Sequence, residues 1–269
     1  MCNAKDAVVC SAGGRGWGAA WGHEFFVIPD EAGEHRAGDT VVLDVLSTHY
    51  FTAGEEIENP EACEVYSVKN GRRAGDDLAL TPNTDRRWLE ARLLLADNDP
   101  VIVAGNRKGG HYCVFTDGSI ADGARAEAAA AYPDKAVARA EYFARFSKLY
   151  LNPAAGDTSF SAPLGQELEI VPLDNPARLR PGSFTRAKFR VLYQGQPLAD
   201  AEISATYDYY DYKTANAYAQ TTRTDAKGEA IFKIDHGGLW LVRVSDARDS
   251  TRGADVDTLS AVLVFTARQ

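Results

Sequence analysis

The sequence lacks a hydrophobic run long enough to cross a membrane as a helix, and it lacks recognisable signatures of catalysis. No stretch of its 269 residues approaches the roughly 18–20 consecutive apolar residues that span a bilayer. It contains no GxSxG, HExxH, P-loop or dinucleotide-binding motif, and no spacing links its serine, histidine and aspartate residues as a triad. We therefore expect no transmembrane segment and no enzymatic activity.

Basic residues are too few for a nucleic-acid-binding protein. The chain has 29 Lys and Arg against 38 Asp and Glu, which gives a net charge of −9. Binding to a phosphate backbone needs a basic footprint, so nucleic acid is excluded as the expected partner. An acidic surface is compatible with attraction of cations, although most acidic surfaces serve solubility.

Cysteine is also scarce, with four residues and no CxxC pair, which argues against a structural zinc knuckle. Cys2 and Cys10 lie close to the start of the chain, which leaves Cys63 and Cys113. In an oxidising compartment these two could form a disulfide that closes a loop of about 50 residues and adds roughly 4 kcal/mol of stability. The alternative is two separate buried thiols.

The start of the chain has features of a secretory leader. Gly18 and Ala20 are small residues at the −3 and −1 positions that signal peptidase reads, which predicts a leader over residues 1–20. The leader is atypical, because Lys5 is its only early positive charge and Val8-Val9-Cys10 is a very short apolar core. Cleavage after Ala20 would place the mature protein in the periplasm or outside the cell.

The same cleavage would expose Trp21-Gly22-His23 as a new N-terminus. A free amine, two backbone amide nitrogens and an imidazole at the third position form a square-planar set, which suits Cu(II) and Ni(II). The alternative is that His23 simply begins a first strand, His23–Ile28, with no role in metal binding.

Short β-strands are predicted throughout the first half of the chain, residues 21–155. Residues 23–29, 40–47 and 101–105 are apolar and rich in β-branched side chains, whereas residues 87–95 fit a strand or a helix equally well. We predict an N-terminal β domain over residues 21–155.

Within this domain, alanine and charged residues dominate residues 122–149, which predicts a short helical insertion. Pro133 divides this segment, and Asp134 could cap a helix over residues 134–146. A strand over residues 143–150 is the competing prediction.

A polar segment, residues 152–163, separates this domain from a second one. Beyond it, about seven short strands recur at roughly ten-residue spacing with turn signals between them, which is typical of a β-sandwich. We therefore predict an all-β protein with two β-sandwich-like domains. The second covers residues 156–269 and is expected to be immunoglobulin-like or transthyretin-like.

Histidine is the most plausible metal ligand in this sequence, because imidazole suits Ni, Co, Cu and Zn. His23 opens the mature chain, His49 ends the second predicted strand, and His111 begins a later one. Strand ends often gather at one rim of a sandwich, so these three residues are candidate metal ligands. The alternative is that they are scattered. His35 and His236 lie in a loop and a turn and are expected to be solvated.

Aromatic and acidic residues alternate in Tyr207-Asp208-Tyr209-Tyr210-Asp211-Tyr212. Tyrosine is enriched in binding patches, so this tract suits a surface for a partner or a glycan. Alternation also suits a strand with one packed face, which is the favoured interpretation.

Several motifs occur in an order that resembles a known family. The chain resembles a periplasmic family of unknown function that is associated with nickel and cobalt uptake. The motifs are Gly22-His23-Glu24-Phe25-Phe26-Val27-Ile28-Pro29, Leu168-Glu169-Ile170-Val171-Pro172-Leu173-Asp174-Asn175-Pro176, residues 191–201, Thr224-Asp225-Ala226-Lys227-Gly228 and residues 238–244. This resemblance implies that a histidine near the N-terminus helps to bind the metal. One departure is Ser245-Asp246, where such proteins often carry a histidine.

Two functions follow as hypotheses. The first is a periplasmic metal-binding protein that delivers Ni²⁺ or Co²⁺ to a membrane transporter component, with His23 and the new amine as primary ligands and His49 or His111 completing the set. The second is a non-catalytic adhesion or interaction module that presents the Tyr-rich tract.

Overall fold

The structure is a computed structural model that describes residues 23–31 and 33–268. The expected leader and the expected Trp21-Gly22 chain start lie outside these residues. The described chain is built almost entirely of β-strands, with a single α-helix, which confirms the all-β prediction. No helix in the described part is long and apolar enough to cross a bilayer.

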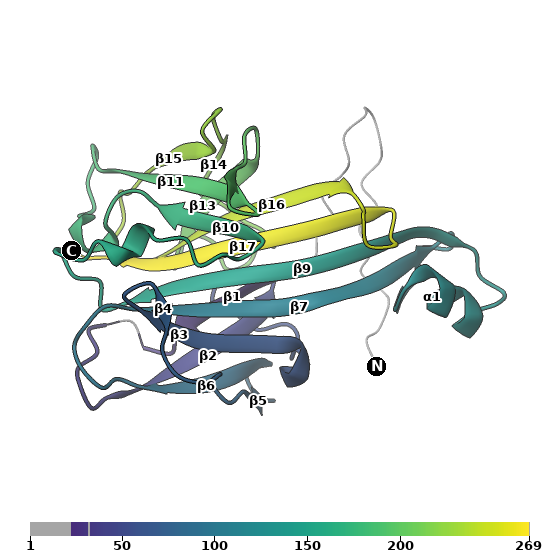
Figure 1. Cartoon of the computed structure of the whole chain (residues 1–269), viewed down its shortest axis with the longest axis horizontal. Helices are drawn as coiled ribbons and strands as arrows, with labels where there is room; N and C mark the ends of the chain where they lie inside the picture. The colour runs from purple at the N-terminus through teal and green to yellow at the C-terminus, as the bar shows by residue number, and fades with distance from the viewer. Residues whose placement is uncertain (1–22, 32, 269) are drawn as a thin grey trace. The chain divides into compact units, whose positions relative to one another are not determined.

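The chain divides into two compact units (Figure 1). Of the described residues, the larger unit contains residues 23–108 without residue 32, then Ala144–Asp246, and then residues 259–268. The smaller unit contains Gly109–Phe143 and Ala247–Thr258. The sequence predicts a boundary near residue 155, and the larger unit contains strands from both sides of that position.

In the larger unit, a four-stranded antiparallel sheet has the order β1-β2-β6-β5. Its strands are β1 (Glu24–Pro29), β2 (Thr40–Thr48), β6 (Trp88–Leu94) and β5 (Thr81–Asn83). Both strands predicted at the start of the chain are thus confirmed, and the ambiguous residues 87–95 form a strand. The pairing of β1 with β2 sets Glu24 opposite Thr48 and Pro29 opposite Leu43, so the start of β1 lies beside the end of β2.

A second and larger sheet has the order β14-β13-β16-β17-β9-β7-β3-β4, with β8 paired to β7. Four of its strands have residues in both compact units: β7, β9, β16 and β17. The strands are β3 (Cys63–Lys69), β4 (Arg72–Arg73), β7 (Val101–Phe115), β8 (Ile120–Asp122), β9 (Val137–Leu151), β13 (Glu202–Tyr207), β14 (Gln220–Arg223), β16 (Gly238–Asp249) and β17 (Val256–Ala267).

A third sheet of the larger unit consists of β10 (Leu168–Pro172), β11 (Arg186–Tyr193), β12 (Gln196–Pro197) and β15 (Glu229–Lys233). Three short 3-10 helices lie in connecting segments of the described chain: η1 (Pro60–Ala62), η2 (Ser159–Ser161) and η3 (Pro176–Arg178).

Hydrophobic side chains join these sheets face to face. One core cluster combines residues of the first sheet, such as Phe25 and Leu43, with residues of the second, such as Val103 and Val264. The third sheet also packs against the second, because the ring of Phe189 lies 5.8 Å from that of Phe265. Burial of apolar surface between sheets is the main stabilising contribution in such a fold, and it confirms the sandwich-like prediction.

The smaller unit has its own small core, which combines Cys113 and Phe115 with Ala128 and Ala140. Ala128 belongs to helix α1 (Arg125–Ala131), which starts where the Glu127 side chain accepts a hydrogen bond from the Ala124 backbone N–H. The helical insertion is therefore confirmed, but it lies before Pro133.

The prediction of a helix over residues 134–146 is wrong, because β9 begins at Val137. Its aromatic side chains favour a strand once β7 offers an edge for pairing.

The two cysteines of the described chain are free and buried. Cys63 belongs to the core cluster of the larger unit and Cys113 to that of the smaller one. Burial raises the pKa of the Cys63 thiol to about 12, so this thiol stays protonated. Of the two alternatives, the structure shows the separate buried thiols.

The Tyr-rich tract leaves its strand at Tyr207, where β13 ends. Beyond this point Tyr209 is 87% exposed and Tyr212 is 59% exposed. The favoured interpretation of the tract as a strand is therefore wrong after Tyr207. Further along the same segment, the Asp211 carboxylate accepts hydrogen bonds from the backbone N–H groups of Lys213 and Thr214, which holds residues 211–214 in a turn.

Candidate metal centre

The pairing of β1 with β2 brings two of the predicted ligands together. His23 immediately precedes β1 and His49 immediately follows β2, and the register Glu24–Thr48 makes these two positions neighbours. Their ring centroids lie 4.4 Å apart, with the ring planes tilted by 59°. Both side chains are about one quarter exposed, at 25% and 24%.

A carboxylate from the loop after β2 completes the group. Glu55 Oε2 lies 3.0 Å from His49 Nδ1 and 3.8 Å from His23 Nε2. One ligand atom from each of His23, His49 and Glu55 lies within 4.8 Å of the others, which is a separation that a single metal ion can bridge. We call these three residues the His-His-Glu group.

Glu55 is held in place by hydrogen bonds from His49 and Thr48 at the end of β2. Its Oε2 accepts hydrogen bonds from the backbone N–H of His49 and from the Thr48 hydroxyl, the latter at 3.1 Å. Burial alone raises the pKa of Glu55, but these hydrogen bonds and the nearby His49 ring outweigh burial and leave the pKa below its usual value. The carboxylate is therefore charged at neutral pH and able to act as a ligand.

Glu56 lies on the other side of His23, with its Oε2 2.8 Å from His23 Nδ1. This hydrogen bond is the main reason why the pKa of Glu56 lies below its usual value, and the positive charges of Arg145 and Arg107 add to the effect. A carboxylate on one imidazole nitrogen orients the ring so that the other nitrogen faces a metal. Glu56 therefore positions His23 with Nε2 toward Glu55.

The loop that carries both glutamates is anchored at several points. The Glu56 backbone N–H donates to the carbonyl oxygen of Ser47 at 3.3 Å, and the Ser47 hydroxyl donates to Glu58 at 2.9 Å. Glu58 is buried and lies 3.1 Å from Arg107. These contacts place the carboxylates without help from a bound ion.

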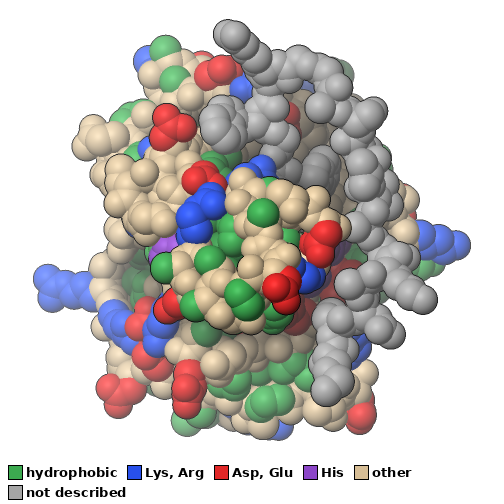
Figure 2. Space-filling model, turned by 90° about the vertical axis from the view of Figure 1, so that its right-hand side faces the viewer, with side chains coloured by type: hydrophobic (Ala, Val, Ile, Leu, Met, Phe, Trp, Pro, Cys, Tyr) green, Lys and Arg blue, Asp and Glu red, His purple; other side chains and the backbone are tan. Residues whose placement is uncertain are grey.

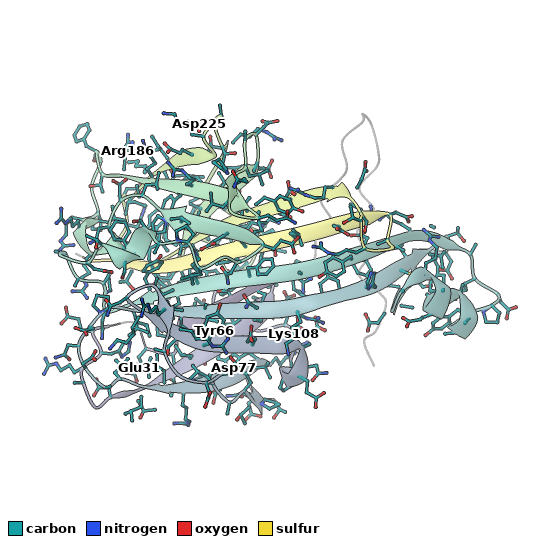
Figure 3. The ribbon with its side chains drawn as sticks, viewed as in Figure 1. Glu31, Tyr66, Asp77, Lys108, Arg186 and Asp225 are labelled. Carbon is teal, nitrogen blue, oxygen red and sulfur yellow. The ribbon has the colours of Figure 1, made fainter. Side chains whose placement is uncertain are left out.

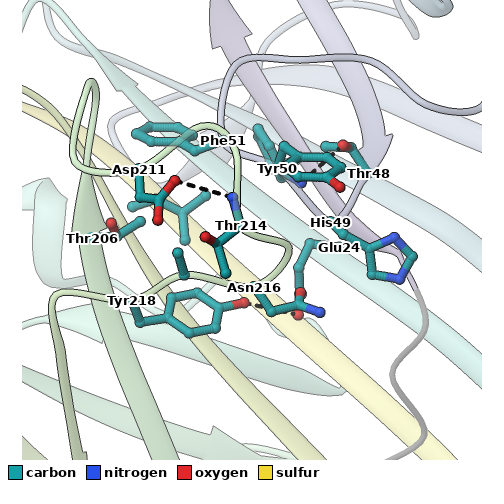
Figure 4. A pocket seen from close by; sticks show the side chains of 13 residues that line it. Glu24, Thr48, His49, Tyr50, Phe51, Thr206, Asp211, Thr214, Asn216 and Tyr218 are labelled. Atoms are coloured by element: carbon teal, nitrogen blue, oxygen red, sulfur yellow. Dashed lines mark hydrogen bonds between the residues drawn. The ribbon is translucent and has the colours of Figure 1, made fainter. Parts of the chain in front are cut away.

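A small pocket adjoins His49 (Figure 4). Its free volume of about 20 Å³ is enough for a water molecule. Glu24, Tyr218 and Asn216 line it, and the Asn216 backbone N–H donates to the His49 carbonyl oxygen at 2.8 Å. Glu24 Oε2 is buried with no hydrogen-bond partner among the described residues, whereas its Oε1 pairs with Arg243.

The third predicted ligand, His111, belongs to the smaller unit and is not part of the group. Its Nε2 lies 3.0 Å from the Arg252 carbonyl oxygen, and its ring packs edge-on against Tyr142 at 5.2 Å. The proposed amine ligand at Trp21 lies outside the described residues.

Glu55 was not among the ligands expected from the sequence. The available signal was weak: residues 54–64 form an acidic loop directly after the second strand.

Two imidazole nitrogens and one carboxylate oxygen fit a divalent transition metal. Imidazole suits Zn, Cu, Fe and Ni, whereas Ca²⁺ and Mg²⁺ prefer sites built from oxygen ligands. Three protein ligands on a partly exposed rim leave coordination positions for water or for a ligand from another molecule. The donor set therefore suits reversible binding of a metal better than a closed structural site.

The fold and this group together define an all-β protein with a two-histidine, one-carboxylate group at the rim of a sandwich. Residues 20–248 match a family described as "Domain of unknown function (DUF4198)". The chain belongs to this family, which confirms the expectation of a family of unknown function. None of the curated proteins matches the chain.

Solved structures show only remote likeness. The D0-D1 domain of intimin has 10% identity and a TM-score of 0.22, over 90% of this chain and 97% of that chain. The fibronectin(III)-like modules of Clostridium thermocellum CbhA have 10% identity and a TM-score of 0.22, over 90% of this chain and 94% of theirs. A TM-score of this size does not establish a common fold.

Proposed function

We propose that this protein binds a divalent transition-metal ion, Ni²⁺ or Co²⁺, as cargo at His23, His49 and Glu55. The observation that carries the proposal is the convergence of these three side chains from two strand ends and one loop. The ion would bind one nitrogen lone pair from each imidazole and the carboxylate of Glu55. The proposed role is non-catalytic.

Exposure and charge support a cargo site. His23, His49 and Glu55 are each between 24% and 29% exposed, so an ion can enter and leave without unfolding of the core. Glu55 and Glu56 both have lowered pKa values, so one negative charge faces the ion and a second lies behind the His23 ring. The nearby Arg107 and Arg145 offset part of that charge, which favours release over permanent retention.

The proposed cellular role rests on the sequence. The small residues before Ala20 and the resemblance to a nickel- and cobalt-associated family support a periplasmic or secreted protein that passes its ion to a membrane transporter component. If Ala20 is the cleavage point, the Trp21 amine would lie two residues from His23 and would add a further nitrogen ligand.

Metal titration of the purified chain tests the proposal. We expect isothermal titration to show one site for Ni²⁺ or Co²⁺, with affinity falling at least tenfold in His23→Ala, in His49→Ala and in Glu55→Gln. His236→Ala is the matched control, because His236 also contacts a carboxylate, that of Asp235 at 2.8 Å, yet is half exposed elsewhere in the same unit. Equal affinity in His49→Ala and in the unchanged protein would contradict the proposal.

One observation favours the second candidate function, an adhesion or interaction module. Tyr209 and Tyr212 stand exposed on the turn that follows β13, where they offer aromatic surface to a partner. Under this alternative, Tyr209→Ala with Tyr212→Ala weakens binding to a glycan array or cell surface, whereas His49→Ala has no effect. The cargo site is supported if His49→Ala weakens metal binding and the two tyrosine substitutions leave metal binding unchanged.

A further inference from the structure

The larger unit has a hollow, away from the His-His-Glu group, whose charge differs in sign from that of the chain as a whole. It is lined by the segment after β1, by the chain after β9 and around η3, and by the end of β17. Its volume of about 690 Å³ lies within the range of small-molecule sites. None of the residues of the His-His-Glu group lines it.

The charged side chains that line this hollow are mainly cationic, although the chain as a whole carries a net charge of −9. Arg36, Arg180, Arg268 and His35 line it, against Glu34 as the one acidic residue among the described lining residues. Arg268 pairs with Glu34 at 2.7 Å, so its charge is largely compensated. Arg36 and Arg180 remain as exposed cations at the rim.

The guanidinium of Arg180 is held in a fixed position. Its Nη1 donates to the carbonyl oxygens of Ala177 at 2.9 Å and Leu179 at 3.3 Å. A guanidinium has five N–H donors, so those of Nε and Nη2 remain for a ligand. Such a planar donor pair matches a carboxylate.

His35 also lines the hollow. Its Nε2 is buried with no hydrogen-bond partner among the described residues, which differs from the solvated side chain that we expected. The His35 backbone is fixed by Asn152, whose side chain accepts from the His35 N–H at 3.2 Å and donates to its carbonyl oxygen at 2.8 Å. A buried polar atom without a partner is costly, and an anionic ligand would supply that partner.

An apolar hollow of about 370 Å³ adjoins the cationic one. The two share Glu34, His35, Asn152, Pro153 and Arg268 as lining residues. The apolar hollow is lined in addition by apolar residues at the ends of β1, β9 and β17: Pro29, Leu149, Leu151 and Ala267. A cationic chamber beside an apolar one suits a molecule with an acidic head and a hydrocarbon body.

We propose that these two adjoining hollows bind a small organic carboxylate, with the carboxylate at Arg36, Arg180 and His35 and the apolar body along the ends of β9 and β17. This site is separate from the proposed metal site and does not depend on it. The ligand class follows from charge and polarity: the guanidinium groups select the anion, and the apolar walls select its chain.

Calorimetric titration of the full chain with sodium octanoate at low ionic strength tests the proposal. We expect one site, at least tenfold weaker binding of the neutral octanamide, and affinity that rises about fourfold per methylene from butyrate to octanoate. Equal binding of octanoate and octanamide would overturn the role of the arginines. Affinity that does not change along the chain-length series would overturn the role of the apolar hollow.

Three variants locate the site. Arg36→Gln with Arg180→Gln should lower octanoate affinity at least tenfold, whereas Glu34→Gln should raise it because Arg268 is freed. Arg186→Gln is the matched control, because Arg186 also donates from Nη1 to two local carbonyl oxygens, those of Ser183 and Thr185, at the start of β11 (Figure 3). Unchanged affinity in the double variant, or an equal loss in Arg186→Gln, would refute the assignment.

The metal site and this site are distinguished by one further variant. His49→Ala should leave octanoate affinity unchanged while it weakens Ni²⁺ binding. Loss of octanoate binding in His49→Ala would show that the carboxylate binds through a metal ion, and the proposal would then be wrong.

Discussion

Gly54 lies against the backbone of Arg86 so closely that a Cβ atom on Gly54 would be 2.3 Å from the Arg86 carbonyl oxygen. The same atom would be 2.6 Å from the carbonyl oxygen of Arg87. Backbone atoms cannot give way as the end of a side chain can. The loop that carries Glu55 and Glu56 is therefore held against the turn before β6 by a contact that only glycine permits.

We expect Gly54→Ala to lower metal affinity at least fivefold, although it removes no ligand. The added methyl group must push the loop away from Arg86, and this moves Glu55 relative to His49. Isothermal titration with Ni²⁺ measures the effect. Gly156→Ala is the control, because no atom lies within 4 Å of the position of its added Cβ. A Gly54→Ala protein with unchanged affinity would show that the loop position does not matter.

A buried carboxyl group on β2 should make stability depend on pH. Asp44 is 3% exposed, and one of its oxygens has no hydrogen-bond partner among the described residues. Burial raises its pKa from 3.8 to about 7; the nearby charges of Asp30 and Glu90 add to the increase, and Arg86 opposes it.

Because the folded state holds this proton more tightly than the unfolded chain, stability should fall as pH rises from about 4 to about 7. The loss contributed by Asp44 is at most about 4 kcal/mol. Asp44→Asn should remove this part of the pH dependence and stabilise the protein at pH 8, as measured by urea unfolding at several pH values. Asp200→Asn, which changes a side chain that is 84% exposed, should leave the profile unaltered.

The buried pair of Lys148 and Glu169 should be sensitive to loss of one partner. The two side chains are 2% and 1% exposed and are in direct contact. Lys148 also donates to the Ile170 carbonyl oxygen at 3.0 Å, and burial lowers the pKa of Lys148. We expect Lys148→Met to cost about 3–5 kcal/mol of unfolding free energy, because Glu169 is then a buried charge without a counter-ion.

The control for this prediction is the double variant Lys148→Met with Glu169→Gln. Its neutral amide oxygen can still accept one of the two backbone hydrogen bonds that Glu169 receives, from Leu164 at Oε1 (2.6 Å) or from Gly165 at Oε2 (3.0 Å). Urea unfolding should show that this double variant is more stable than Lys148→Met alone. The opposite order would mean that the charge of Glu169 is not what destabilises the single variant.

In the smaller unit, Gly109 makes room for the Tyr142 hydroxyl. A Cβ atom on Gly109 would lie 1.8 Å from that oxygen and 2.2 Å from the ring carbon that bears it. We expect Gly109→Ala to lower the melting temperature by several degrees, and Tyr142→Leu in the same chain to restore part of the loss. Gly118→Ala is a poor comparison because Gly118 has a φ of +81°, so Gly156→Ala again serves as the control.

The net charge of the sequence does not show where charges of one sign gather on the surface. The net charge of −9 predicts an acidic protein, and the face in Figure 2 shows acidic and basic side chains interspersed. The cationic hollow at Arg36, Arg180 and Arg268 could not be predicted, because these residues are more than 80 positions apart in the sequence. Only packing of the end of β17 near η3 assembles them.

Some of the candidate metal ligands could be predicted from the sequence, and others only from the tertiary structure. His23 and His49 could be identified as a pair, because each lies at the end of a predicted strand and consecutive strands commonly pair as neighbours. His111 also lies in a predicted strand, but it falls inside β7 and contacts Arg252 instead. Glu55 was missed because an acidic loop offers several carboxylates, and the sequence does not show which one folds back onto His49.

By itself, the sequence determined the all-β class and the positions of the first strands, because apolar and β-branched periodicity is a local property that burial against any sheet will satisfy. Only the tertiary structure decided that residues 137–151 form a strand, since an alanine-rich segment can form either structure until a neighbouring edge is available for hydrogen bonding. It alone also placed the Glu55 carboxylate beside two neighbouring imidazole rings, because these distances depend on the register of β1 with β2 and on how the loop after β2 closes.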